Sequence, residues 1–214
     1  MVQASGTSTV EMVGCWVYNN TAGDEGGVSY MQGNSVVAVK YSQIEFNTAR
    51  RGGVFFGLDN SNTTVHSCNI TNNWSEDGGV MHSVGDDTSR GRPFFIAEDS
   101  TFRYNRALFG GIVYAVTSTY VAWPGGYAAS LSLLSLTRVL LNRYTYMDGC
   151  VMRSNEATAS GGAWYITGNS TMEVKGCQSY SNHAKSDGGL AYVAGVAHLV
   201  VRWVTVCVAW LVCG

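Results

Sequence analysis

Apolar and polar residues alternate in short runs along most of the chain. Runs such as 54–56 and 163–166 are rich in β-branched and aromatic residues, and Gly, Asn, Ser and Asp stand between the runs. A period of two is typical of half-buried strands, whereas an amphipathic helix needs apolar residues three and four positions apart. The pattern therefore predicts an all-β protein built from many short strands.

One pattern of four features recurs six times. A Cys or Ser is followed by an apolar residue two positions later (Ser179 being the exception), by Asn five positions later, and then by Gly-Gly and a further apolar residue. The Cys or Ser positions are Cys15, Ser42, Cys68, Ser100, Cys150 and Cys177. The asparagines are Asn20, Asn47, Asn73, Asn105, Asn155 and Asn182. The Gly-Gly pairs begin at Gly26, Gly52, Gly78, Gly110, Gly161 and Gly188.

The spacing of the Gly-Gly pairs predicts the architecture. The steps are 26, 26, 32, 51 and 27 residues. Three short strands in each repeat of about 26 residues predict a parallel β-helix with one repeat per coil, since a propeller blade needs about 40 residues. We expect a β-helix domain over 1–195 with six clear coils. Because 51 is almost twice 26, residues 116–144 are either a seventh, degenerate coil or an insertion.

The two ends of the chain differ in composition. Residues 1–10 lack the basic residues and apolar run of a secretory signal. Residues 196–214 are very apolar, and we expect them to be either a final coil or no part of the fold. Their longest apolar run, 203–213, has eleven residues including Thr205, fewer than the roughly 20 that a membrane-spanning helix needs.

Stacked coils place each repeat position above its own copy in the next coil. Asn in such a row can donate from its amide to the next carbonyl, so we interpret the six asparagines as a structural ladder. The Gly-Gly row indicates a sharp corner that requires positive φ or close backbone approach. The two residues before Gly-Gly alternate in charge over the first three coils, from Asp24-Glu25 through Arg50-Arg51 to Glu76-Asp77. This alternation favours a charge ladder over a divalent cation site.

Charge and cysteine content narrow the function classes. The 214 residues carry 13 basic and 15 acidic side chains, a net charge of −2, which offers no basic surface for nucleic acid. The histidines show no metal-ligand spacing, and we expect no cofactor, no metal and no catalytic residue. The four cysteines of the repeat row share it with serines, which favours free, buried thiols; only Cys150 and Cys177 lie on adjacent coils.

Two groups of residues are candidates for a binding surface. An aromatic row follows the Gly-Gly pairs, and it is either an exposed stack of rings suited to sugar faces or a protein partner, or part of the core. Its members are Tyr30, Phe56, His82, Tyr114, Tyr165 and Tyr192. The other group is Asp86 and Asp87, in a dense mixed-charge stretch with Arg90 and Arg92, which is either a solvated loop or a substrate site.

The repeats resemble the tandem FxxN and GGA[ILV] motifs of the polymorphic outer membrane proteins of chlamydiae. The first motif stands at 102–105, and more loosely at 70–73 and 44–47; the second stands at 161–163, or with Val, Ile or Leu as its third residue. The resemblance implies a right-handed, single-stranded, pectin-lyase-like β-helix. It also implies a surface adhesin at the cell surface or outside the cell. Only one repeat has a true Phe and only one has Ala after Gly-Gly.

Two functions remain open from the sequence. One is adhesion or recognition of glycans or cell-surface proteins by a β-helical rod without chemistry, with further repeats of a longer chain as additional partners. The other is a carbohydrate-active enzyme, lyase-like or hydrolase-like, or a degenerate relative of one. A convergent pair of carboxylates on one face of the coils favours the enzyme, and an outward aromatic face without such a pair favours the rod.

Overall fold

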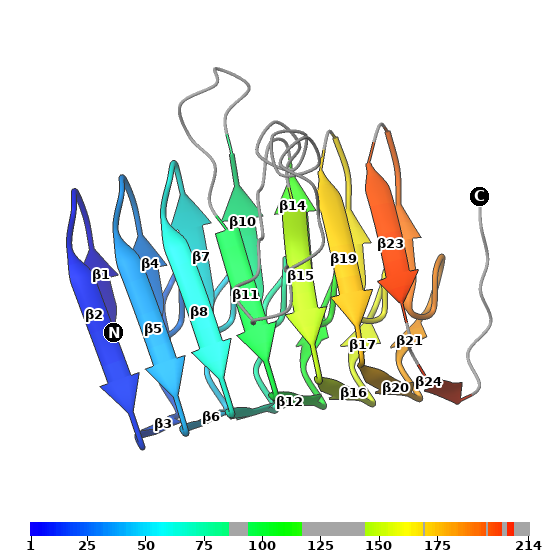
Figure 1. The fold of residues 1–214 in the computed structure, drawn as a ribbon, viewed down its shortest axis with the longest axis horizontal. Helices are drawn as coiled ribbons and strands as arrows, with labels where there is room; N and C mark the ends of the chain where they lie inside the picture. Colours follow the sequence, from blue (N-terminus) through cyan, green and yellow to red (C-terminus); the bar gives the residue numbers. More distant parts are fainter. Residues whose placement is uncertain (86–93, 117–143, 169, 196, 203–204, 208–214) are drawn as a thin grey trace, which may run out of the picture.

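The computed structural model describes the chain except for residues 86–93, 117–143, 169, 196, 203–204 and 208–214. The described residues form strands and turns without a helix, so they include no helix that could cross a membrane. The strands assemble into three long parallel sheets and one short one (Figure 1). The protein is therefore all-β, as predicted.

The three long sheets have seven strands each. Sheet A contains β1 (Val2–Ala4), β4 (Ser29–Met31), β7 (Phe55–Leu58), β10 (Met81–Val84), β14 (Val113–Val116), β18 (Trp164–Ile166) and β22 (Ala191–Val193). Sheet B contains β2 (Thr9–Val13), β5 (Val36–Lys40), β8 (Asn62–His66), β11 (Phe94–Glu98), β15 (Tyr144–Asp148), β19 (Thr171–Lys175) and β23 (His198–Arg202).

Sheet C contains β3 (Trp16–Tyr18), β6 (Gln43–Glu45), β9 (Asn69–Thr71), β12 (Thr101–Arg103), β16 (Val151–Arg153), β20 (Gln178–Tyr180) and β24 (Thr205–Cys207). The short sheet D contains β13 (Arg106–Ala107), β17 (Glu156–Ala157) and β21 (His183–Ala184).

The chain visits sheets A, B and C in rotation and returns to the neighbouring strand of sheet A. We call one such set of three strands a rung; Figure 1 shows the rungs side by side in sequence order from blue to red. Each strand pairs in parallel with the matching strands of adjacent rungs, for example β4 with β7 and β5 with β8. This topology is consistent with a parallel β-helix.

Residues 117–143, which include most of the predicted coil or insertion, lie outside the described residues. The strands on either side are nevertheless direct neighbours: β11 pairs with β15, and β12 pairs with β16. No other described strand stands between them. In the apolar C-terminal segment, β23 pairs with β19 and β24 pairs with β20, so both extend their sheets.

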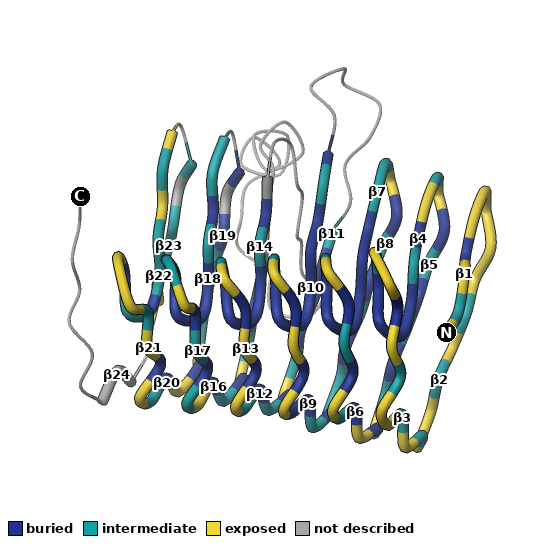
Figure 2. The backbone as a smooth tube through the Cα atoms, turned by 180° about the vertical axis from the view of Figure 1, so that it is seen from behind, coloured by how far each residue is buried: buried dark blue, intermediate teal, exposed yellow. Residues whose placement is uncertain are grey.

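The core lies between the three sheets and is filled by inward-facing residues of most of the described strands. Phe55, Phe95, Phe102 and Trp164 are fully buried there. Figure 2 shows buried backbone along the sheets and exposed backbone at the turns. Burial of every second side chain is what the alternating pattern requires.

The two glycines of each Gly-Gly pair meet two different requirements. Gly52 has φ 62°, and a Cβ there would collide with the carbonyl oxygen of Phe55. Gly53 has no positive φ, but a Cβ would collide with the carbonyl oxygen of Gly79 in the next rung and lie 2.7 Å from that of Trp74. The first glycine therefore makes the corner, and the second lets adjacent rungs approach.

The six asparagines form one hydrogen-bonded column through the molecule. The Nδ2 of Asn73 donates to Oδ1 of Asn105 (3.0 Å), and the backbone N–H of Asn73 donates to the same oxygen (3.1 Å). The same Nδ2 also donates to the carbonyl of Ile44 in the rung before (3.2 Å). This arrangement repeats from Asn47 to Asn155, and these side chains are fully buried. The column satisfies polar groups that burial would otherwise leave unpaired.

The Cys or Ser row has a related role. The Oγ of Ser42 accepts the backbone N–H of Cys15 (3.0 Å), and the Oγ of Ser100 accepts that of Cys68 (3.1 Å). Cys68, Cys150 and Cys177 are buried free thiols, as expected, while Cys15 is free and half-buried. The row thus accommodates a small side chain that ends in a hydroxyl or a thiol.

We expect Asn105→Ala to lower the free energy of unfolding by about 2 to 4 kcal/mol, because two buried donors of Asn73 lose their acceptor. Urea denaturation followed by circular dichroism measures this. Asn20→Ala is the matched control at the half-buried end of the column, where the amide donates to Asn47 and Tyr18, and it should cost about 1 kcal/mol. Equal losses in both variants would show that the column does not act as a buried network.

Candidate functional site

The predicted aromatic row lies on the outer face of sheet A. Tyr30, Phe56 and His82 are register partners, and the row continues through Tyr114 and Tyr165 to Tyr192. Their chain neighbours Met31, Phe55, Met81 and Trp164 belong to the central core. Because successive strand residues point to opposite faces, the row points away from that core. The row therefore lies outside the central cluster, but it is not an open stack, since Phe56 and His82 are buried (1% and 4% exposed).

Three neighbouring pairs of rings in this row are stacked, while His82 is tilted against both of its neighbours. Tyr114 and Tyr165 have centroids 5.0 Å apart and planes 18° apart, and Tyr165 and Tyr192 have centroids 4.7 Å apart and planes 11° apart. Tyr30 and Phe56 are stacked as well, with centroids 5.6 Å apart. Ring faces that cover each other are not open to a ligand. The row can offer ring edges and tyrosine hydroxyls, but not the flat platform that suits a sugar face.

A second row, formed by the residue before each Gly-Gly, runs beside the rings. Arg51 lies between Glu25 and Asp77 in the backbone pairing, and its guanidinium carbon is 5.3 Å from the ring centroid of Phe56. Arg51 forms an ion pair with Glu25 (2.5 Å), and Arg50 forms one with Asp24 (2.6 Å). Charges thus alternate along this row as predicted. Among the described residues no group of three His, Cys, Asp or Glu could hold a metal ion.

His82 has the most strongly shifted pKa of the ring row. It is 4% exposed, between Phe56 (5.2 Å) and Tyr114 (4.9 Å), and Nδ1 is 3.9 Å from Oδ2 of Asp77 with no hydrogen-bond partner. Burial lowers the pKa of His82 to about 3, and raises the pKa of Asp77. The histidine is therefore neutral near pH 7 and acts as an aromatic filler of the row.

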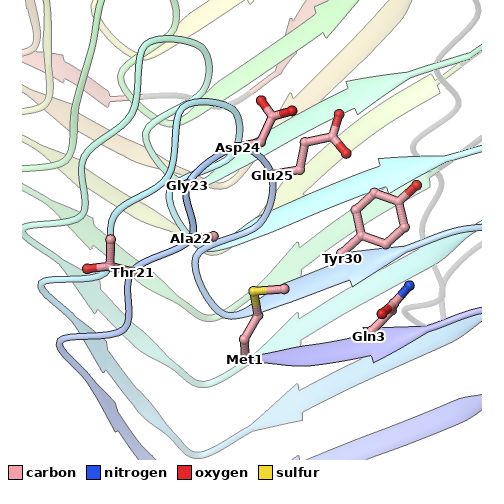
Figure 3. Close-up of a pocket in the computed structure, with 8 residues that line it drawn as sticks. All are labelled: Met1, Gln3, Thr21, Ala22, Gly23, Asp24, Glu25 and Tyr30. Atoms are coloured by element: carbon pink, nitrogen blue, oxygen red, sulfur yellow. The ribbon is translucent and has the colours of Figure 1, made fainter.

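A cleft of about 400 Å³ lies at the start of the ring row (Figure 3). Tyr30 and its register partner Gln3 line it together with Met1, Asp24 and Glu25. Burial raises the pKa of both Glu25 and Tyr30. Since Asp24 is paired with Arg50 and Arg51, the cleft offers a small polar recess without a free pair of carboxylates. Asp86 and Asp87, the other predicted candidates, lie outside the described residues.

A different set of aromatic side chains is open to solvent on the outer face of sheet C and at the turn after it. We call this set the aromatic band; its members are Trp16, Tyr18, Phe46, Trp74 and Tyr104. Trp16 is 71% exposed, and none of the five is less than 46% exposed. The rings of Trp16 and Tyr18 are tilted by 59°, and those of Tyr18 and Phe46 by 72°, so they leave faces uncovered. Exposed residues recur at this corner in Figure 2.

The repeat pattern could have revealed the aromatic band. Several matching positions in later rungs are polar: Gln178 corresponds to Trp16, Ser154 to Phe46 and Glu156 to Trp74, whereas Tyr104 shares the row of Phe46. An aromatic side chain that is not shared by its row is not explained by the stacking of the row. Contiguous exposed apolar groups of this kind are typical of binding surfaces.

The outer face of sheet B carries a column of charges at the last position of each strand. Lys40, His66, Glu98 and Asp148 follow one another in register, and Lys175 comes next. Nδ1 of His66 lies 3.4 Å from Glu98, and Nζ of Lys175 lies 3.6 Å from Asp148. The Tyr146 hydroxyl donates to Asp148 (3.2 Å), and burial raises the pKa of this tyrosine.

Glu98 and Asp148 are thus two carboxylates on adjacent strands of one face. Neither residue was among the candidates predicted from the sequence, although both stand two residues before the Cys or Ser of the repeat. Adjacent strands are about 4.8 Å apart, close to the carboxyl separation of about 5 to 5.5 Å in retaining glycosidases. Each carboxylate also has a basic neighbour, which is the arrangement of a charge ladder.

Protein stability should fall as the pH falls from about 6.5 toward 3. Because the pKa of His82 is lowered from 6.5 to about 3 in the folded state, the unfolded chain binds a proton in this range that the folded chain does not. We expect a loss of about 2 to 3 kcal/mol by pH 4.5, measured by urea denaturation at each pH. In His82→Phe, which matches Phe56 in the same row, this part of the pH dependence should be absent. Identical pH slopes in both proteins would contradict the expectation.

The chain was compared with protein-family models, with curated proteins and with solved structures, and none of the three comparisons found a match. Its likeness to the polymorphic outer membrane proteins therefore rests on the FxxN and GGA[ILV] motifs alone.

Proposed function

We propose that the chain is a segment of a right-handed, single-stranded, pectin-lyase-like β-helical rod that recognises glycans or cell-surface proteins. Motifs shared with the polymorphic outer membrane proteins and the rotation of the chain through three parallel sheets support this architecture. The same resemblance supports a location of the rod at the cell surface or outside the cell. The rod acts by adhesion and carries out no chemistry.

The observation that carries the proposal is the aromatic band. Its rings are exposed although burying aromatic surface would stabilise the fold, and no repeat position requires them. Gln43 lies beside Trp16 in register, Glu45 lies beside Tyr18, and Asn72 is exposed next to Thr71. Ring faces next to amide and carboxylate groups can cover the apolar face of a sugar and hydrogen-bond its hydroxyls. They suit an aromatic-rich protein patch equally well.

The test is a binding assay of the full chain on neutral and acidic polysaccharides and on whole cells. We expect retention of the protein without release of new reducing ends. The triple variant Trp16→Gln, Phe46→Ser, Trp74→Thr should bind at least about tenfold more weakly, a loss of about 1.4 kcal/mol. These replacements match Gln43, Ser154 and Thr48 at the equivalent positions, so the fold accommodates them.

Tyr41→Ser is the control for this triple variant. Tyr41 is 62% exposed at the corner before sheet C, where it packs edge-on against His66 at 5.6 Å, and Ser67 is its equivalent in the next rung. Its binding should change less than twofold, on the order of 0.4 kcal/mol. Equal losses in the control and the triple variant would reject the aromatic band as the binding surface.

The carboxylates of Glu98 and Asp148 favour a second candidate function, cleavage of a glycosidic bond on the outer face of sheet B. In this case one carboxyl group protonates the leaving oxygen and the other attacks the sugar. Release of reducing ends by the wild-type chain would support it. Such release should fall by at least about a hundredfold in Glu98→Gln and in Asp148→Asn. Release that persists in both variants would come from a contaminating enzyme and would exclude this site.

A further inference from the structure

Two buried thiols lie directly above one another in adjacent rungs. Cys150 precedes β16 and Cys177 precedes β20, and they are 0% and 1% exposed. The flanking residues are register partners, Asp148 with Lys175 and Val151 with Gln178. The N–H of Gln178 donates to the carbonyl of Cys150 (2.8 Å). Cys150 and Cys177 are therefore in register themselves.

The other described cysteines of this row have no such neighbour. Ser42 separates Cys15 from Cys68, and Ser100 separates Cys68 from Cys150. Cysteines two rungs apart have Cα atoms about 10 Å apart, beyond the limit of about 7 Å for a disulfide. Adjacent rungs are about 4.8 Å apart, within the usual Cα range of about 4.4 to 6.8 Å. Among the described residues, the row holds one pair within bonding range.

The two cysteines have the same local geometry. Each cysteine follows a glycine at the same corner, Gly149 with φ 60° and Gly176 with φ 61°. Each Sγ also donates to the equivalent carbonyl of the preceding rung, that of Ala97 and that of Met147, both at 3.4 Å. The neighbouring Cys150 thiol lowers the pKa of Cys177, which favours its thiolate. The side chains thus leave their corners in the same direction.

We propose that Cys150 and Cys177 are a modification site at which an intramolecular disulfide forms when the chain folds with a disulfide oxidant present. The thiolate of one cysteine, having lost its proton to solvent, attacks a sulfur of glutathione disulfide and releases one glutathione thiolate. The second cysteine then attacks the mixed disulfide and releases the second glutathione thiolate. The two protein thiols are oxidised, and one glutathione disulfide is reduced to two glutathione molecules.

Formation of the bond is tied to folding because the finished core excludes the oxidant. Both thiols are inside the packed rungs, so an oxidant reaches them only before the rungs close. The bond joins the corner before β16 to the corner before β20. In the rung that follows β20, Ala191 and Leu199 are only half-buried. Closing this loop lowers the entropy of the unfolded chain and so stabilises these rungs.

The experiment starts from the full chain, reduced and unfolded in urea, which is refolded with a mixture of glutathione and glutathione disulfide. Peptide mapping by mass spectrometry without reductant identifies the linked cysteines. We expect the 150–177 link to be the main product when the chain refolds with the oxidant present. The link should be scarce when the oxidant is added to the unfolded chain in urea, and scarce when the oxidant is added to the folded protein. The urea midpoint of the oxidised protein should be higher than that of the reduced protein, and reductant should reverse the shift.

Variants of the same row provide the controls. Cys177→Ser should lose both the link and the shift, and Ser42 and Ser100 show that the row accommodates serine. Cys68→Ser should keep both. Another pairing as abundant as 150–177, an equal yield of the link in urea, or an unchanged urea midpoint would each overturn the proposal.

Discussion

Stacking of adjacent rungs in register, at the spacing of one strand, is the constraint on which the rest of this structure depends. A residue in a rung has its own repeat equivalent above and below it, so each row must tolerate contact with itself. Gly53 illustrates the limit set by the space between rungs, since a Cβ at this position would collide with the carbonyl oxygen of Gly79. Asn73 illustrates the polar limit, since its amide is both donor and acceptor along the column. Few side chains meet either condition, which explains why these rows are uniform.

The same constraint decides which aromatic residues can meet a ligand. In the row from Tyr30 to Tyr192, stacking places ring on ring, and the faces that a sugar would use are covered by neighbours. Trp16 and Phe46 stand in rows that are mostly polar, with Val151 and Tyr104 as the other apolar members, and their faces remain open. Recognition is therefore expected where the repeat is broken, while regular rows hold the fold together.

Register also fixes the electrostatics of the outer faces. In the sheet B column, Glu98 and Asp148 are neighbours, and each has a basic residue on its other side, His66 or Lys175. A single exposed ion pair of this kind contributes little to stability. Four in-register groups nevertheless concentrate charge on one strip of the surface. This strip and the aromatic band lie on different sheets, so their contributions to binding or chemistry can be separated by mutation.

The sequence by itself determined the strands, the repeat length, the asparagine column and the glycine corners, because each depends on a local pattern that recurs every 26 residues or so. It also gave the alternation of charge from Asp24 to Asp77 and the burial of Cys68, Cys150 and Cys177. Only the tertiary structure decided which way a row points. Tyr30 and Met31 differ by one position, and they face opposite sides of sheet A because the strand pleat, rather than hydrophobicity, sets their direction. Contacts between rungs, such as that between Glu98 and Asp148, likewise depend on which strands become neighbours across 49 intervening positions, and no local pattern encodes that.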